Sequence, residues 1–129
     1  MNPQSITYHA ASRTLELCYA DGFDSLLPAE LLRVYSPSAE VRGHSESERK
    51  LQTGKKHIGI DSMESIGNYA LRIVFSDGHD TGIYSWDYLA DLSRHKEEYW
   101  QKYIVELRSA NASRLPTIPV GQWKPEVES

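Results

Sequence analysis

One pattern occurs twice in the chain, and it constrains the fold more than any other feature of the sequence. Alternating apolar residues run into an Asp-Gly pair and a second aspartate, over residues 15–24 (LELCYADGFD) and again over residues 71–80 (LRIVFSDGHD). Alternation is typical of a half-buried strand, and Asp-Gly favours a hairpin turn because glycine readily takes a positive φ. Each copy therefore predicts a strand, a tight turn and a returning strand. Shared turn chemistry explains the repeat, and an ancient duplication stays open.

The segments around these hairpins complete an α+β prediction. Antiparallel hairpins form a small sheet, a short helix follows the first hairpin over residues 29–34, and a longer helical segment lies toward the C-terminus. Pro28 suits the first position of the short helix, and Ser85 suits the N-cap of the longer segment, which is expected to break near Ser93. The expected strands are 6–8, 14–19, 23–27, 57–66, 69–75 and 80–84.

Length and charge restrict the class of protein. A chain of 129 residues is long enough for one domain, which we place at residues 1–110, with an extended or disordered tail over 111–129 that contains three prolines. The net charge of −4 gives no reason to expect a nucleic acid or a membrane as partner. No apolar run reaches the ~20 residues of a membrane helix, and the N-terminus lacks the features of a signal peptide. With Cys18 as its single cysteine, the chain is expected in the reducing cytoplasm.

A polar stretch, residues 36–56, separates the two hairpins and is predicted to be a long loop. It is locally basic, and such charge runs are mostly solvated surface. The functional alternative is a docking patch for an acidic protein partner. In the tail, Trp123 is a second candidate contact, since an extended proline-rich segment loses little entropy on binding. The basic candidates are Arg42, Arg49, Lys50, Lys55 and Lys56.

The run GNYALRIVFSDGHDTGIYSWDYL, residues 67–89, resembles the signature of the gamma-butyrobetaine hydroxylase-like N-terminal domain family, long known as a domain of unknown function. Residues 15–33 resemble the first half of that domain, and the resemblance extends over about residues 6–105. In the metal-binding branch of the family, a Cys-x-Cys-x-x-Cys loop and a later histidine hold zinc. The corresponding positions here are Ser36, Ser38, Val41 and His79.

This comparison implies that the zinc site is vestigial. Such sites rely on thiolate ligands, for which a serine hydroxyl is a poor substitute, and valine has no donor atom. We therefore expect no metal, with His79 in a structural role and Arg42 tying the loop to Asp77 or Asp80. The alternative is a rebuilt zinc or iron site that combines His79 with His44 and Glu46, which have the residue types of a two-histidine, one-carboxylate centre.

No nucleophile–base pair or phosphate loop is evident in the sequence, so we expect no enzymatic activity and no cofactor. Related domains are appended to oxygenases and to Mrp-type P-loop carriers that handle iron–sulfur clusters. The resemblance therefore implies an accessory module that acts through contacts with an unknown protein partner. A metal-binding domain that uses His79 and His44 is the main alternative, and a subunit that supplies part of an enzyme site is a third. A homo-oligomer stays open.

Overall fold

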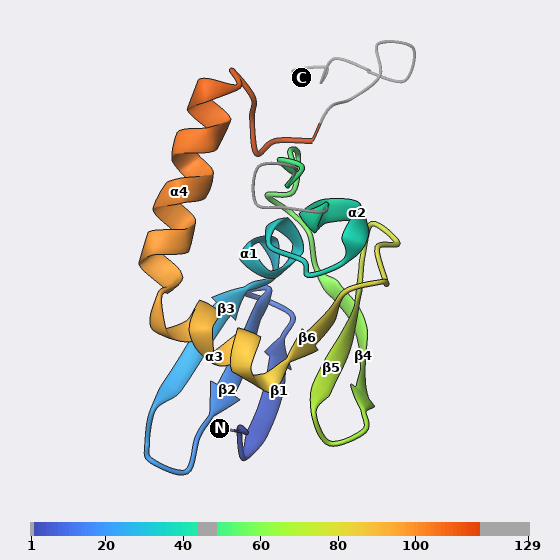
Figure 1. Cartoon of the computed structure of the whole chain (residues 1–129), viewed down its shortest axis with the longest axis vertical. Coiled ribbons are helices and arrows are strands. Elements are labelled where there is room, and N and C mark those ends of the chain that lie inside the picture. Colours follow the sequence, from blue (N-terminus) through green and yellow to red (C-terminus); the bar gives the residue numbers. More distant parts are fainter. Residues whose placement is uncertain (1, 44–48, 117–129) are drawn as a thin grey trace, which may run out of the picture.

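The computed structural model describes residues 2–43 and 49–116 and confirms an α+β fold (Figure 1). The strands form two three-stranded antiparallel sheets, in the orders β1-β2-β3 and β4-β5-β6, rather than one small sheet. The strands are β1 (Ser5–His9), β2 (Thr14–Cys18), β3 (Asp24–Pro28), β4 (Ile60–Ile66), β5 (Ala70–Phe75) and β6 (Ile83–Ser85). The helices are α1 (Ala29–Val34), α2 (Ala39–Arg42), α3 (Trp86–Arg94) and α4 (Lys96–Ser109).

The repeated sequence pattern corresponds to a repeated structure. The turn glycines Gly22 and Gly78 have φ angles of 86° and 88°. In each turn the aspartate before the glycine accepts a hydrogen bond from the amide two residues further on, at 3.0 Å for Asp21 and 3.1 Å for Asp77. Each copy is a three-stranded meander that leads directly into a helix, α1 in the first copy and α3 in the second.

The main core lies between the sheets and the helices. Helix α3 contacts both β3 and β6 and so bridges the two sheets, while α4 packs against α1 and α3. Every residue of α1 is buried, which explains why its short sequence is apolar around most of its circumference. The fully buried large side chains include Leu15, Leu17 and Leu27 from the first sheet, Ile73, Phe75 and Tyr84 from the second, and Leu89, Leu92 and Tyr103 from the helices.

Several predicted boundaries were wrong by a few residues. Pro28 ends β3 and occupies the N-cap of α1, not its first helical position. Residues 57–59 precede β4 instead of belonging to it. The returning strand β6 is shorter than expected, because residues 80–82 form no regular ladder with β5: of these three, Gly82 accepts one backbone hydrogen bond, from the Ile73 amide at 3.4 Å. The predicted break in the C-terminal helical segment falls at His95, two residues after Ser93.

The polar stretch of residues 36–56 is not wholly a loop, because it contains the one-turn helix α2. Val41, one of the few apolar residues in this stretch, is 2% exposed and anchors the turn in the interior. Extended backbone at Ser38 precedes the turn, and Gly43 follows it with a φ of 69°. Periodicity did not reveal this helix because a single turn offers only one buried position.

After α4 the chain turns back onto the domain. The amide of Gly54 donates to the carbonyl of Ser113 at 3.0 Å, and the amide of Lys56 donates to that of Arg114 at 2.9 Å. The domain therefore continues past residue 110, at least through Arg114. Among the described residues, no helix combines the length and hydropathy that a membrane crossing requires. His44, Glu46 and Trp123 lie outside the described residues.

Candidate functional site

Three of the four vestigial-site residues meet at one point. The ring nitrogen Nε2 of His79 lies 2.8 Å from Ser36 Oγ and 3.4 Å from Ser38 Oγ. All three side chains are buried, and His79 is 8% exposed. The fourth residue, Val41, is buried on the following turn of α2. The tertiary structure thus brings residues from positions 36–41 and from the β5–β6 turn together, as the resemblance implied.

Close packing of the backbone positions this network. Ser36 lies two residues after the last residue of α1, and it packs against Gly82, which directly precedes β6. A Cβ atom added to Gly82 would lie 2.6 Å from Ser36 Oγ and 3.1 Å from the ring of Tyr84, so only glycine fits there. The Tyr84 hydroxyl donates to the carbonyl of Leu32 at the end of α1. The loop therefore rests directly on the second sheet.

The hydrogen-bond pattern assigns the protonation of His79. The amide of Ser38 donates to Ser36 Oγ at 3.3 Å, so the Ser36 hydroxyl is free to donate its own proton to His79 Nε2. The remaining proton of a neutral ring then resides on Nδ1, which faces Glu40 Oε2 at 3.8 Å. Burial lowers the pKa of His79, with the Arg33 charge adding to the effect, so the neutral ring is the favoured form.

A charged cluster supports the turn from its other side. Asp77 accepts from Arg33 Nε at 2.9 Å and from Lys55 Nζ at 2.6 Å, and its other oxygen accepts from the His79 amide. Burial alone would raise the pKa of Asp77, but the bonds from Lys55, the His79 amide and Arg33 outweigh it and lower the pKa to about 2. Sequence reasoning missed Arg33 and Glu40, because these contacts span about 40 residues and no local pattern marks them.

The donor set does not fit a zinc ion. Two neutral hydroxyls and one imidazole stand where the resemblance implies three thiolates and one imidazole, and Val41 offers no donor. The hydroxyls are also engaged with His79 Nε2, the atom that would have to bind the metal. The residues at this loop therefore form a closed hydrogen-bonded network, and no step of chemistry is assigned to a metal there.

The same residues have the outline of a serine–histidine–carboxylate triad, with Ser36, His79 and Glu40 in order. Acyl transfer requires that the nucleophile reach a substrate carbonyl. Ser36 is 2% exposed, and its hydroxyl is enclosed by Gly82, Tyr84 and His79. A substrate cannot approach it without opening the loop. The arrangement is better suited to holding the loop on the sheet than to catalysis.

The five basic candidates divide into two groups. Arg49 pairs with Glu106 of α4 and stacks 4.7 Å over the Tyr35 ring, and Lys55 pairs with Asp77, so both hold the domain together. The expectation that Arg42 would bind Asp77 or Asp80 was wrong, since Arg42 lies 5.2 Å over the ring of Tyr88 on α3. The side chains of Arg42, Lys50 and Lys56 are exposed.

Comparison with known proteins decides the family. The model of the family described as gamma-butyrobetaine hydroxylase-like, N-terminal, matches residues 6–90 of the chain. The chain belongs to this family. It is also similar to two proteins whose structures were solved in solution by NMR. The first is 47% identical, with a TM-score of 0.79 over 92% of this chain and 94% of its own. The second is 43% identical, with a TM-score of 0.77 over 98% of this chain and 93% of its own.

A third similar structure carries a family assignment of its own. It is the crystal structure of a protein of unknown function from Acidithiobacillus ferrooxidans ATCC 23270, which belongs to the DUF971 family. This relative is 38% identical, with a TM-score of 0.61 over 71% of the present chain and 92% of its own. No curated protein matches the sequence. These relatives establish a gamma-butyrobetaine hydroxylase-like N-terminal domain and assign it no specific role.

Proposed function

We propose that the protein is a small, non-enzymatic accessory module that acts in the cytoplasm through protein contacts. The observation that carries this proposal is the closed network around His79, in which Ser36 and Ser38 occupy the positions of metal ligands and satisfy one another's hydrogen bonds. A site without open donors or an accessible nucleophile favours a scaffolding role over chemistry. The hydroxylase named in the family description supports a link to oxygenase biochemistry, and the link to iron–sulfur biochemistry rests on the resemblance alone.

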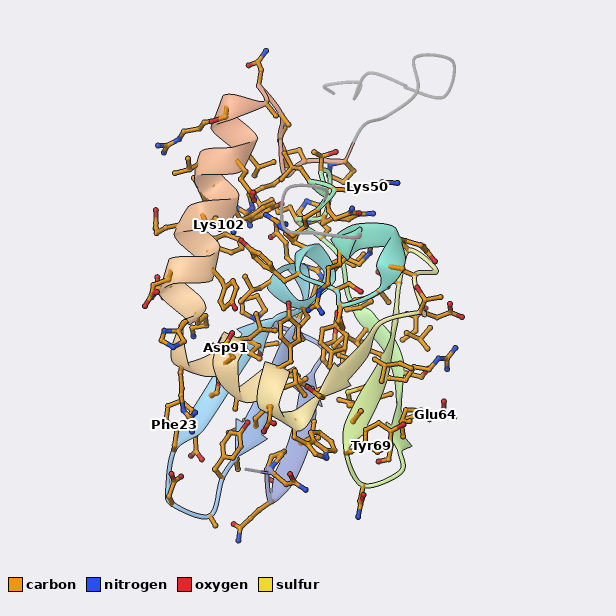
Figure 2. The ribbon with its side chains drawn as sticks, in the orientation of Figure 1. Phe23, Lys50, Glu64, Tyr69, Asp91 and Lys102 are labelled. Atoms are coloured by element: carbon orange, nitrogen blue, oxygen red, sulfur yellow. The ribbon has the colours of Figure 1, made fainter. Side chains whose placement is uncertain are left out.

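The surface beside this network supports an acidic protein as the partner. The amide of Lys50 donates to the carbonyl of Val41 at 2.7 Å, which places Lys50 next to α2 and close to Arg42 along the backbone. Within the described residues neither Lys50 nor Lys56 makes an ion pair. Figure 2 shows Lys50 at the α2 side of the molecule and Lys102 on α4. Exposed cations such as Lys50 and Lys56 speed the association of oppositely charged surfaces.

Charge reversal with a matched control tests the proposal. Proteins captured from native lysate by the full chain should be compared with those captured by Lys50→Glu/Lys56→Glu and by Lys102→Glu. We expect one partner to be lost with the double variant and retained with Lys102→Glu. Its association rate should fall several-fold as salt rises from about 50 to about 300 mM, because screening shortens the Debye length. A partner that binds equally to both variants at all salt concentrations would contradict the electrostatic surface.

The metal-binding alternative predicts a different result. If His79 served as a ligand together with His44, then His79→Ala would release a stoichiometric zinc or iron ion from the protein. On the present proposal His79→Ala leaves the metal content of tag-free protein unchanged, as measured by elemental analysis. A chelator should also shift the melting temperature of His79→Ala and of the unaltered chain by the same amount, because no metal-binding energy at this loop supports the fold.

A further inference from the structure

A second cluster of ligand-type side chains lies on the first sheet, away from the His79 network. Glu16 and Cys18 are two residues apart on β2, so they project from the same face of the sheet. Asp24 of β3 is the direct cross-strand partner of Cys18. One ligand atom from each of these three residues lies within 4.8 Å of the other two. Two ligands at alternate positions of one strand and a third on the adjacent strand can face a single point.

A fourth ligand-type residue completes the arrangement from β1. His9 Nε2 lies 2.8 Å from Glu16 Oε1, while Cys18 Sγ lies 3.6 Å from the other oxygen, Oε2. The same carboxylate therefore contacts an imidazole on one side and a thiol on the other. β1, β2 and β3 are adjacent strands of one sheet, as Figure 1 shows. The opposite face carries Leu15 and Leu17 and is buried in the core. The cluster is thus held on a rigid support and is open to solvent.

The donor types and spacing suit a divalent cation of the zinc class. Carboxylates alone would suit hard cations, but a thiolate and an imidazole favour zinc and its neighbours in the transition series. Tetrahedral bonds to sulfur, nitrogen and oxygen ligands place ligand atoms about 3.3–3.8 Å apart. The three ligand atoms lie within 4.8 Å of one another, so about 1 Å of side-chain movement brings them to these separations. Asp24 is exposed and can supply this movement by rotating its side chain.

We propose that Glu16, Cys18 and Asp24 form a binding site for a zinc-class divalent metal ion, with His9 orienting Glu16 from the adjacent strand. A histidine hydrogen-bonded to a ligating carboxylate fixes that ligand's orientation. This proposal is independent of the proposed function and concerns a different part of the chain from the vestigial loop. The expectation of a metal-free protein concerned the loop of residues 36–44 and His79, and the site proposed here lies on the other sheet.

The charges of the cluster favour a dication, because the carboxylates of Glu16 and Asp24 lie beside the Cys18 thiol. A bound dication displaces the proton of that thiol.

Cobalt titration tests the proposal with a spectroscopic readout. The full chain, without a tag and stripped of metal, should be titrated with Co²⁺ while the thiolate-to-cobalt charge-transfer absorption is followed. We expect one Co²⁺ per chain, displaced by Zn²⁺. Cys18→Ser should abolish the charge-transfer band, and His9→Ala should weaken binding by about ten- to a hundredfold, as expected for an orienting residue. All four side chains are at the surface or half-buried, so circular dichroism should show folded variants.

Two controls separate this site from others. Glu64→Gln removes an exposed carboxylate from β4 of the other sheet, and His79→Ala disrupts the vestigial loop; both should bind Co²⁺ as the unaltered chain does. A charge-transfer band that survives Cys18→Ser would overturn the proposal. So would the absence of the band at saturating Co²⁺. Binding only above about 1 mM Co²⁺, or about 4 kcal/mol, would mean an adventitious ion only and would likewise overturn it.

Discussion

At the scale of single residues, the loop of residues 36–42 depends on one hydrogen-bonding group. Ser36 Oγ accepts from the Ser38 amide and contacts His79 Nε2, while Ser38 Oγ reaches the same nitrogen at the longer distance of 3.4 Å. Ser36 thus connects the loop both to itself and to the β5–β6 turn. This role is the hydrogen-bonded counterpart of a metal ion that links the same two segments.

Ser36→Ala should destabilise the protein. The change leaves the buried Nε2 of His79 and the Ser38 amide without their main partner, which costs about 1–3 kcal/mol in the free energy of unfolding. Ser38→Ala is the matched control, and its cost should be smaller because it removes one long bond. Urea unfolding measures both. Equal midpoints for Ser36→Ala and the unaltered chain would show that the network contributes nothing to stability.

His79 should also make stability depend on pH. Burial lowers its pKa in the folded protein below the usual 6.5. Below pH 6.5 the unfolded chain therefore binds a proton that the folded chain does not, and stability falls as the pH drops through this range. Above pH 6.5 the contribution is complete. Urea midpoints at pH 7.5 and pH 5.5 should differ less for His79→Gln than for the unaltered chain. An unchanged difference would contradict the assignment to His79.

At the scale of elements, the two Asp-Gly turns have the same backbone conformation. The positive φ of Gly78 has a specific consequence, since nothing lies within 4 Å of a Cβ atom built there. A substitution at Gly78 is therefore opposed by backbone strain alone and not by a clash. The same holds for Gly22.

Gly78→Val should cost about 1–3 kcal/mol, the usual range for a residue held in an unfavourable φ/ψ region. Gly78→Asn should cost less, because asparagine tolerates positive φ better than a β-branched residue does. Thermal unfolding of the two variants, together with Gly22→Val, provides the comparison. Equal melting temperatures for Val and Asn at position 78 would contradict the strain argument.

The loop and α2 bring the four positions that the resemblance equates with zinc ligands close to one another. Ser38 Oγ lies 3.4 Å from His79 Nε2, within the separations of about 3.3–3.8 Å between zinc ligands, and Ser36 Oγ lies nearer, at 2.8 Å. The triple variant Ser36→Cys/Ser38→Cys/Val41→Cys should therefore bind one Zn²⁺ per chain at this loop. Adding His79→Ala to the triple variant should weaken that binding. Elemental analysis of both, carried out with Cys18→Ser in the background, measures the effect.

At the scale of the whole molecule, the segment after α4 is tied to α1 by a buried carboxylate. Glu30 is 5% exposed and accepts from Tyr103 Oη at 3.0 Å and from Arg114 Nε and Nη2 at 2.8 and 2.7 Å. Arg114 also stacks over the Trp100 ring at 4.9 Å. The Glu30–Arg114 contact joins two residues that are 84 positions apart in the sequence, and it fixes residues 111–114 to the domain.

Arg114→Ala should destabilise the whole domain, not only its C-terminal segment. Removing one partner of a buried pair costs about 3–5 kcal/mol, and because Arg114 is about one-third exposed we expect roughly 2–3 kcal/mol. Glu30→Gln/Arg114→Ala should recover part of the loss, since no buried charge is left. Urea unfolding of the single and double variants decides this. A single variant as stable as the double variant would contradict the role of the buried charge.

The sequence by itself determined the local features of this protein. The alternating strands, the Asp-Gly turns, the N-cap at Ser85 and the α+β class all follow from interactions between residues close in the chain. Such local interactions do not depend on where a segment lies in the tertiary structure. The tertiary structure alone decided the rest: two sheets instead of one, the burial of Val41 on α2, and the long-range pairs Arg33–Asp77, Arg49–Glu106 and Glu30–Arg114. The ligand cluster of Glu16, Cys18 and Asp24 belongs to the same group. Such contacts depend on which strands become neighbours and in which register, and a single sequence does not specify that pairing locally.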